Sequence, residues 1–302
     1  MRIGIASPRI DVVIELFPRI KKAFKNVSMV LLHGKSDQPY KYCQLTICTT
    51  HQLLRFKEAF DILVIDEVDV FPFSGSQMLH FAVKQAVKKN SATLYLTATP
   101  DSCLLKSIAK NKISVSYLPL RFHGHLLPEI KIVKQKDLGN NISREKLPQK
   151  FIHDISQLVS QNKKCLVFVP HIKDLALVKN ALQKNQINAK FETVFSADPK
   201  RLDKVSKMRN GELDFLITTT ILERGVTFYG INVIVLKADD EIFSTSPLVQ
   251  IAGRVGRSAA QPSGKLDFYV ENRTKTLKNA QWQIRHMNQK GRRILKSEMS
   301  SL

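Results

Sequence analysis

The sequence predicts an α/β protein with two lobes, each built on a parallel sheet that helices cover. Its 302 residues are enough for two domains of ordinary size. Short apolar runs alternate with longer helical patterns in both halves, as is typical of parallel strands joined by crossover helices. A polar stretch punctuated by Gly and Pro separates the two series. We therefore expect lobes at residues 1–120 and 151–302, with a linker at 121–150.

The first half contains short runs of apolar and β-branched residues that predict strands. These runs are 2–6, 27–32, 45–49, 62–66, 93–97 and 114–118. Between them, the apolar spacing predicts helices at 10–24, 51–56, 76–88 and 102–109. In the first helix Val13, Phe17, Ile20 and Phe24 form one apolar face. Pro18 lacks a backbone N–H, so we expect a kink or a split there.

The second half repeats the alternation. Strands are expected at 165–169, 191–195, 214–218, 232–236 and 265–270. Helices are expected at 145–160, 172–184, 199–210 and 247–254, and the linker holds an extended stretch at 131–133.

The last 32 residues form a separate basic helix. They hold eight Lys and Arg against two Glu, and Leu277, Ala280, Ile284 and Met287 share one face, with Trp282 nearby. Such a helix can dock its apolar face on the second lobe, or present its basic face to nucleic acid. Docking is favoured, and the two roles are compatible.

Composition excludes several classes of protein. With 43% hydrophobic and 24% charged residues, the chain can bury a core and is not a disordered polypeptide. No apolar run approaches the ~18 residues of a membrane span. Pro8 and Asp11 stand where a signal peptide would be apolar. We expect a cytoplasmic protein, with peripheral attachment to the inner face of the membrane left open.

The charge points to nucleic acid as the partner. Lys and Arg number 47 against 26 Asp and Glu, a net charge of +21. An excess of this size suits a polyanion. The four cysteines are scattered without a CxxC pair, so we expect buried free thiols and no zinc site.

The sharpest candidate site is the run Ile62-Leu-Val-Ile-Asp-Glu-Val-Asp69. An apolar strand ends there in carboxylates, at the sheet edge where α/β folds bind ligands. Asp66 could hold Mg²⁺ through water, and Glu67 could orient an attacking water in phosphoryl transfer. An acidic turn after a strand is the simpler alternative.

Three further runs support the chemical interpretation. Thr97, Ala98 and Thr99 follow another predicted strand, and their hydroxyls can hydrogen-bond to the carboxylates. Arg254 and Arg257 lie three residues apart, on one face of a helix, and two guanidinium groups there suit a triphosphate. Residues 217–227 carry hydroxyls that could contact a nucleic-acid backbone, with a Gly that permits a tight turn.

These runs resemble motifs II, III, V and VI of superfamily 2 helicases, in the right order. Residues 6–11, ASPRID, resemble motif Ia, and residues 48–52, CTTHQ, resemble motif Ib. The exact motif sequences are similar to those of the late-competence DNA-uptake helicases of the ComFA type. They are IDEVD followed by Phe-Pro, TATP, TTTILERGVTF and QIAGRVGRS. The resemblance covers essentially the whole chain. It implies two RecA-like lobes with ATP and Mg²⁺ at their interface, moving along single-stranded DNA.

The resemblance also implies roles for single residues. Asp66 and Glu67 would serve Mg²⁺ and water, and Arg254 and Arg257 would be arginine fingers. The expected nucleotide-binding set adds Asp69, Gly225 and Gln250, and the expected coupling residues are Thr97, Ala98 and Thr99. The expected DNA track is lined by Ser7, Pro8, Arg9, Thr49, Thr50 and Thr219. Other DNA-uptake proteins are expected partners.

The chain departs from this family at the phosphate-binding loop, GxxxxGK(S/T). Its only Gly-Lys-Ser is Gly34-Lys35-Ser36, which follows motif Ia instead of preceding it, and Met29 stands where the first Gly belongs. The four-Cys zinc module common in such helicases is also missing. We therefore expect a first lobe truncated at its N-terminus, a mis-started reading frame or a remnant, and defective ATP hydrolysis. Two alternatives stay open: a non-catalytic nucleic-acid- or partner-binding remnant, and a repair or restriction helicase of the same superfamily.

Overall fold

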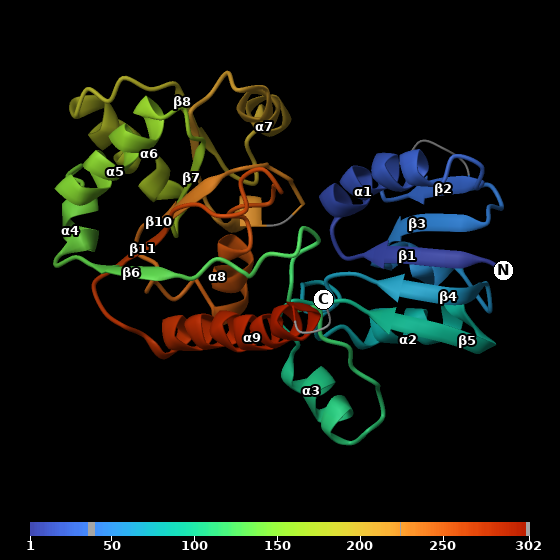
Figure 1. Cartoon of the computed structure of the whole chain (residues 1–302). Coiled ribbons are helices and arrows are strands. Elements are labelled where there is room, and N and C mark those ends of the chain that lie inside the picture. Colours follow the sequence, from blue (N-terminus) through green and yellow to red (C-terminus); the bar gives the residue numbers. More distant parts are fainter. Residues whose placement is uncertain (36–39, 224, 300–302) are drawn as a thin grey trace. The chain divides into compact units, whose positions relative to one another are not determined.

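The computed structural model describes residues 1–35, 40–223 and 225–299 of the chain. The chain divides into two compact units, Met1–Val115 and Ser116–Leu302. Each unit contains one sheet whose strands all run parallel (Figure 1). This architecture confirms the predicted α/β class with two parallel sheets. The Ser36 end of the Gly-Lys-Ser tripeptide lies outside the described residues.

The first unit holds a sheet in the order β2-β3-β1-β4-β5. Its strands are β1 Ile3–Ser7, β2 Met29–Leu32, β3 Leu45–Thr49, β4 Phe60–Ile65 and β5 Val87–Tyr95. The register pairs Ile3 of β1 with Leu45 on one side and with Ile62 on the other. The next residue, Gly4, packs closely against β4: a Cβ there would stand 2.7 Å from the Leu63 side chain, which would have to shift.

Helices cover both faces of this sheet. They are α1 Ile10–Ala23, the 3₁₀ helix η1 Thr50–Arg55 and α2 Gln77–Ala86, while α3 Ser102–Ala109 follows β5 and has no buried residue. Val13 of α1 packs with Leu45 and Ile47 in one cluster, while α2 contributes Leu79 and Val83 to a cluster on alternate strand positions. Side chains alternate between the two faces of a strand, so one sheet serves two cores.

Two predictions in this unit need correction. The strand expected at 114–118 is wrong, because that segment has no regular structure and Leu118 is 84% exposed. A β-rich run forms a strand only where a neighbour pairs with it. Pro18 does not split the first helix, because α1 continues through it.

The second unit holds a sheet in the order β6-β11-β10-β7-β9-β8. Its strands are β6 Lys131–Lys134, β7 Cys165–Phe168, β8 Phe191–Val194, β9 Phe215–Thr218, β10 Asn232–Val235 and β11 Leu266–Val270. The stretch expected as a linker contributes β6, which pairs with β11. It also contributes a short helix whose Leu138 and Ile142 are buried. Much of 121–150 therefore belongs to this sheet and its core.

Helices again lie on both faces. They are α4 Leu138–Ser143, α5 Gln149–Ser160, α6 Ile172–Lys184, α7 Arg201–Asn210, η2 Thr220–Glu223, α8 Thr245–Ala252 and α9 Lys275–Met299. One core cluster joins the sheet to α4, α5 and α6, and another joins it to α7, α8 and α9. Figure 1 shows α9 as the long helix at the C-terminal end. Among the described residues, no helix is long and apolar enough to cross a membrane.

Candidate functional site

The carboxylates of the first unit lie directly after β4, at the carboxyl edge of the sheet. The backbone N–H of Asp66 donates to the carbonyl of Ala6 at 2.8 Å, which ties the motif to the end of β1. The N–H of Glu67 donates to Oδ1 of Asp66 at 2.9 Å. Glu67 has a φ of 55°, so the chain turns sharply there and leaves the strand direction. Both carboxylates are partly exposed.

Asp69 joins this turn to the end of β5. Its Oδ1 accepts a hydrogen bond of 2.8 Å from the Thr97 hydroxyl, and its Oδ2 accepts one of 2.7 Å from the Thr99 hydroxyl. Thr97 also accepts from the Thr99 N–H at 2.9 Å. Ala98, between them, is exposed. Asp69 therefore connects the carboxylate run after β4 with the hydroxyl run after β5, as the sequence predicted.

The donor set at this edge fits Mg²⁺ chemically. Magnesium in phosphoryl-transfer sites is usually held by one or two carboxylates, with waters and substrate phosphates completing the shell. Asp66 supplies one such carboxylate, partly exposed and fixed at a strand end. The fit to a triphosphate is poor, because the 302 residues contain no GxxxxGK(S/T) loop to hold it.

The residues expected to line a DNA track at this edge are largely buried. Ser7 is 1% exposed, Thr49 4% and Thr50 0%, and Pro8 is buried as well. Arg9 is partly exposed and immediately precedes α1. In this conformation Arg9 is the member of the set in this unit whose polar group can reach a ligand without rearrangement.

In the second unit, motifs V and VI contact each other. Nε of Arg254 donates to the backbone carbonyl of Glu223 at 2.8 Å, and Arg254 is only 2% exposed. Thr219 follows β9 and is also buried, while Gly225 has a φ of 70° that favours glycine. The expected arginine finger therefore packs inside its own unit in this conformation.

Arg257 and Gln250 are more accessible than Arg254. Gln250 is partly exposed on α8, and Nε of Arg257 donates to the carbonyl of Gly253 at 3.1 Å. Gly256, next to Arg257, has a φ of 66°, and a Cβ there would stand 2.2 Å from the Pro262 carbonyl. Only glycine fits this turn.

Arg121 binds the backbone of the same turn. It is not among the candidate site residues predicted from the sequence. Its guanidinium donates to the carbonyls of Val255 at 2.5 Å, Gly256 at 2.7 Å and Gly253 at 3.3 Å. Burial, and then the like charge of Arg257, lower the pKa of Arg121 to about 10. No sequence signal links residues so far apart, because the contact is made to backbone carbonyls.

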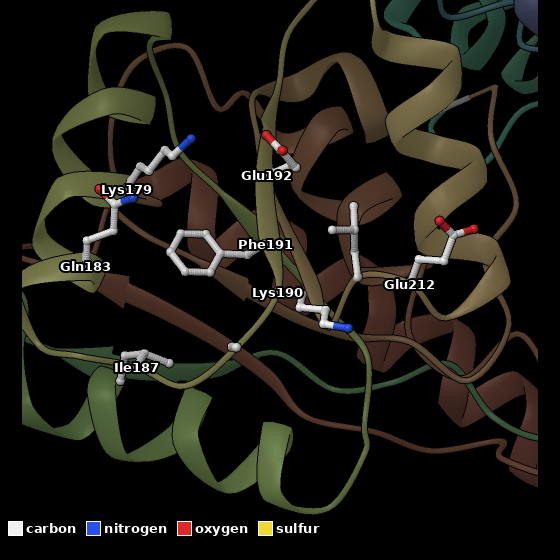
Figure 2. Close-up of a pocket in the computed structure, with 9 residues that line it drawn as sticks. Lys179, Gln183, Ile187, Lys190, Phe191, Glu192 and Glu212 are labelled. Atoms are coloured by element: carbon white, nitrogen blue, oxygen red, sulfur yellow. The ribbon is translucent and has the colours of Figure 1, made fainter.

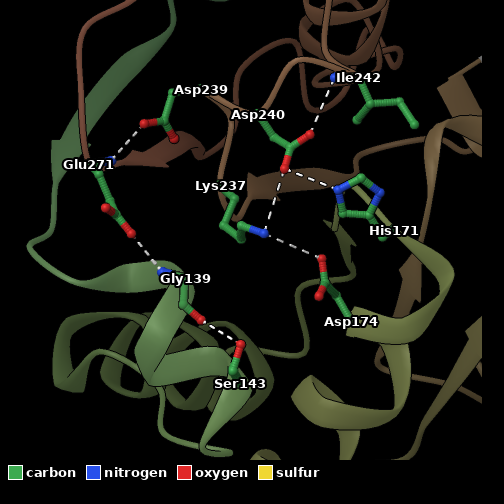
Figure 3. Close-up of polar contacts among 9 residues, drawn as sticks. All are labelled: Gly139, Ser143, His171, Asp174, Lys237, Asp239, Asp240, Ile242 and Glu271. Atoms are coloured by element: carbon green, nitrogen blue, oxygen red, sulfur yellow. Dashed lines mark hydrogen bonds and ion pairs between the residues drawn. The ribbon is translucent and has the colours of Figure 1, made fainter.

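A polar network occupies the carboxyl ends of β7, β10 and β11 (Figure 3). Nε2 of His171 lies 3.1 Å from Oδ2 of Asp240, and Nζ of Lys237 lies 3.5 Å from the same oxygen. Lys237 also approaches Asp174 of α6 at 3.8 Å. The sequence signal was available, since Lys237 and Asp240 closely follow a predicted strand, as Asp66 does.

A surface pocket of the second unit lies at the opposite edge (Figure 2). Phe191, at the start of β8, lines it with Lys179 and Gln183 of α6, and with Glu212 and Leu213 just before β9. These positions are at the amino ends of the strands. Ligand sites of parallel α/β sheets form at the carboxyl ends, so this pocket is not the candidate site.

Comparisons with known proteins identify relatives of the chain. The family model described as "Helicase conserved C-terminal domain" matches residues 148–259. The chain is 40% identical over 289 residues to the competence protein ComFA of Bacillus subtilis, covering 96% of this chain and 62% of the relative. It is 40% identical over 284 residues to ComFA of Streptococcus pneumoniae, covering 94% of this chain and 65% of the relative. The chain thus spans less than two thirds of the length of these curated relatives.

A solved structure shares the fold. S. cerevisiae Dbp5 bound to RNA and ADP BeF3 matches with a TM-score of 0.66 at 15% identity, over 95% of this chain and 75% of that one. At that identity the likeness shows the fold alone, and it confirms the RecA-like α/β expectation. The chain is therefore similar to the ComFA competence proteins over most of its length, and residues 148–259 match the helicase C-terminal domain.

Proposed function

We propose that the chain carries motifs Ia to VI of an ATP-dependent single-stranded DNA translocase of the DNA-uptake type. The observation that carries this proposal is the hydrogen bonding of Asp69 to Thr97 and Thr99. It links a carboxylate motif to the end of the neighbouring strand, at the ligand-binding edge. The similarity to two competence proteins, ComFA, supports the DNA-uptake context. In that context the chain works on the cytoplasmic side of the membrane, with other competence proteins as partners.

Each motif residue receives a role in the proposal. Asp66 holds Mg²⁺ through water, and Glu67 orients the water that attacks a phosphate. Asp69 couples conformational changes at this site to Thr97, Ala98 and Thr99. In the second unit, the nucleotide is bound by Gly225, Gln250, Arg254 and Arg257. Arg254 must leave the carbonyl of Glu223 before it can do so.

The nucleic-acid role rests on backbone contacts. Ser7, Pro8, Arg9, Thr49, Thr50 and Thr219 are the proposed track. Contacts of Ser, Thr and Arg with phosphates position a strand without reading its bases. Because Ser7 and Thr50 are buried, we propose that the edge opens when DNA binds.

A second candidate is a non-catalytic nucleic-acid-binding protein with the same fold. The absence of a GxxxxGK(S/T) loop from the 302 residues favours it for this polypeptide. A repair role is the third candidate, since a transcription-repair-coupling factor of Staphylococcus epidermidis is 25% identical over 243 residues, 76% of this chain and 19% of that relative.

The test is binding of the purified chain to labelled oligonucleotides, measured by fluorescence anisotropy. Three unrelated single strands and one duplex are compared. We expect similar affinity for the three single strands, and Arg9→Ala should weaken all of them alike. Arg19→Ala is the matched control, because Arg19 lies on α1 and pairs with Glu15 at 2.6 Å. Strong preference for one sequence, or no binding, would overturn the proposal.

A further inference from the structure

Helix α9 presents the one tryptophan of the chain to solvent. Trp282 is 64% exposed, although it belongs to a helix whose other face packs in the core of the second unit. A large exposed aromatic ring offers apolar area and a π face to a partner.

The inward face of α9 fixes how the helix is rotated. Leu277, Ala280 and Ile284 are buried in the core cluster beneath it. Asn288 makes two hydrogen bonds to the backbone of Leu127, accepting from its N–H at 2.9 Å and donating to its carbonyl at 3.0 Å. The outward direction of Trp282 therefore follows from packing.

Gly291 extends this fixed contact toward the C-terminal end of the helix. A Cβ at Gly291 would stand 2.8 Å from the Leu126 side chain and 2.9 Å from that of Leu120. The chain segment before β6 therefore lies directly against α9. Nζ of Lys290 lies 3.8 Å from the ring centroid of Tyr117, which holds the same segment.

The outward face of α9 is cationic along its length. Residues three, four and seven positions from Trp282 share its side of a helix. The exposed members of this face are Lys275, Lys278, Asn279, Arg285, His286, Gln289 and, eleven positions or three turns beyond Trp282, Arg293. Between residues 272 and 297 the sequence has eight Lys and Arg and no Asp or Glu. From Lys275 to Arg293 the face is about 27 Å long at 1.5 Å per residue.

A second ring of α9 stacks on the indole. His286 stacks on Trp282 with ring centroids 5.1 Å apart and an interplanar angle of 12°. One face of the indole is therefore supported, and the ring remains largely exposed. A braced ring flanked by cations is the arrangement on which bases of single-stranded nucleic acid stack, while the cations contact the phosphates.

We propose that the outward face of α9, centred on Trp282, is a stacking platform for single-stranded DNA, separate from the helicase motifs. This inference rests on the proposed function and adds a second contact for the same strand. Duplex DNA keeps its bases stacked internally, so it can use the cations of this face but not the indole. An anionic membrane surface would use the same cations and is treated as an outcome of the test.

The single tryptophan makes the test direct. Its emission is recorded while unlabelled oligo(dT) is added to the purified chain, and affinity is measured in parallel by anisotropy of a labelled strand. We expect quenching that saturates with the anisotropy signal. Trp282→Ala should weaken binding about 5- to 150-fold, the range for loss of one stacked base. Trp282→Phe should bind nearly as the parent does, because an aromatic face is kept.

Phe24→Ala is the matched control, since Phe24 is a 54% exposed aromatic residue of the other unit. It should bind as the parent does. If DNA binds but neither tryptophan emission nor the Trp282→Ala affinity changes, the platform is wrong while the proposed function stands. If no single strand binds, both fail. Emission that responds to phosphatidylglycerol vesicles and not to oligo(dT) would overturn the platform in favour of a membrane contact.

Discussion

The hydroxyl of Thr97 donates a hydrogen bond of 2.8 Å to Oδ1 of Asp69. Thr99 donates to the other oxygen, so a single carboxylate holds the end of β5 against the turn that follows β4. The bidentate arrangement fixes the orientation of the carboxylate. We therefore propose that a change in the position of Asp69 moves residues 97–99 as well.

The double substitution Thr97→Val and Thr99→Val should destabilise the first unit. It leaves a partly buried carboxylate without these two donors, and hydrogen bonds to charged groups contribute about 1.5–3 kcal/mol each. We expect hydrogen exchange of amides in β4 and β5 to accelerate correspondingly. Ser91→Ala, at an exposed position of β5, is the control and should stay within about 0.5 kcal/mol of the parent. Equal exchange in the double variant and the control would contradict this role.

Acid should weaken the second unit through Asp154. Burial raises the pKa of this carboxyl, but hydrogen bonds from Lys150, Lys265 and Tyr269 outweigh burial and hold it below its ordinary value of 3.8. A folded-state pKa below the unfolded one contributes stability above the unfolded value, and that stability is lost as the pH falls through the folded value.

The comparison with Asp154→Asn measures this contribution. The loss of melting temperature caused by Asp154→Asn should be constant near neutral pH and should shrink below about pH 4. Circular dichroism recorded at increasing temperature gives the melting temperatures of the parent and the variant. A difference that stays constant or grows in acid would show that Asp154 is not held ionised by its partners.

Limited proteolysis should separate the two units before Arg121. Lys110 and Lys112 are exposed and precede the boundary between Val115 and Ser116. Arg121 is fastened to the carbonyls of residues 253, 255 and 256. We expect trypsin to cut after Lys112 first, as read by mass spectrometry. A first cut at or after Arg121, or no cut between 110 and 150, would contradict this boundary.

The alternation of strands and helices was predictable because it depends on the local spacing of apolar residues. The run ending at Asp66 and the run ending before Thr97 are apolar strands followed by polar residues, so their meeting at one edge follows from parallel pairing. The burial of Arg254 was not predictable, because its partner is a backbone carbonyl that any residue would supply. The same holds for Arg121, whose contacts span more than 130 residues.

β6 shows where prediction from local sequence fails. The extended stretch at 131–133 was recognised, but its membership of a sheet depends on β11, which follows in sequence more than 130 residues later. The run at 114–118, Ser-Val-Ser-Tyr-Leu, also contains residues that favour strands, and it forms no strand. Local propensity cannot distinguish these two cases, since the free energy of a strand comes from its neighbours.

ATP hydrolysis is expected to be negligible for the 302-residue polypeptide. Catalysis of phosphoryl transfer consists mostly of positioning and charge stabilisation, and these residues contain no loop to fix the phosphates. Phosphate release in the presence of single-stranded DNA should not differ between the parent and Glu67→Gln. Turnover by the parent that Glu67→Gln abolishes would show that the catalytic centre is complete within these residues.

The salt dependence of single-stranded DNA binding tests the central claim most directly. With a net charge of +21, binding should release counterions from the strand. The dissociation constant for oligo(dT), measured by anisotropy at increasing NaCl, should rise linearly on a log–log plot, with a slope of about 0.7 per phosphate contacted. Affinity that does not change with salt, or no measurable affinity at low salt, would contradict a protein that works along a DNA strand.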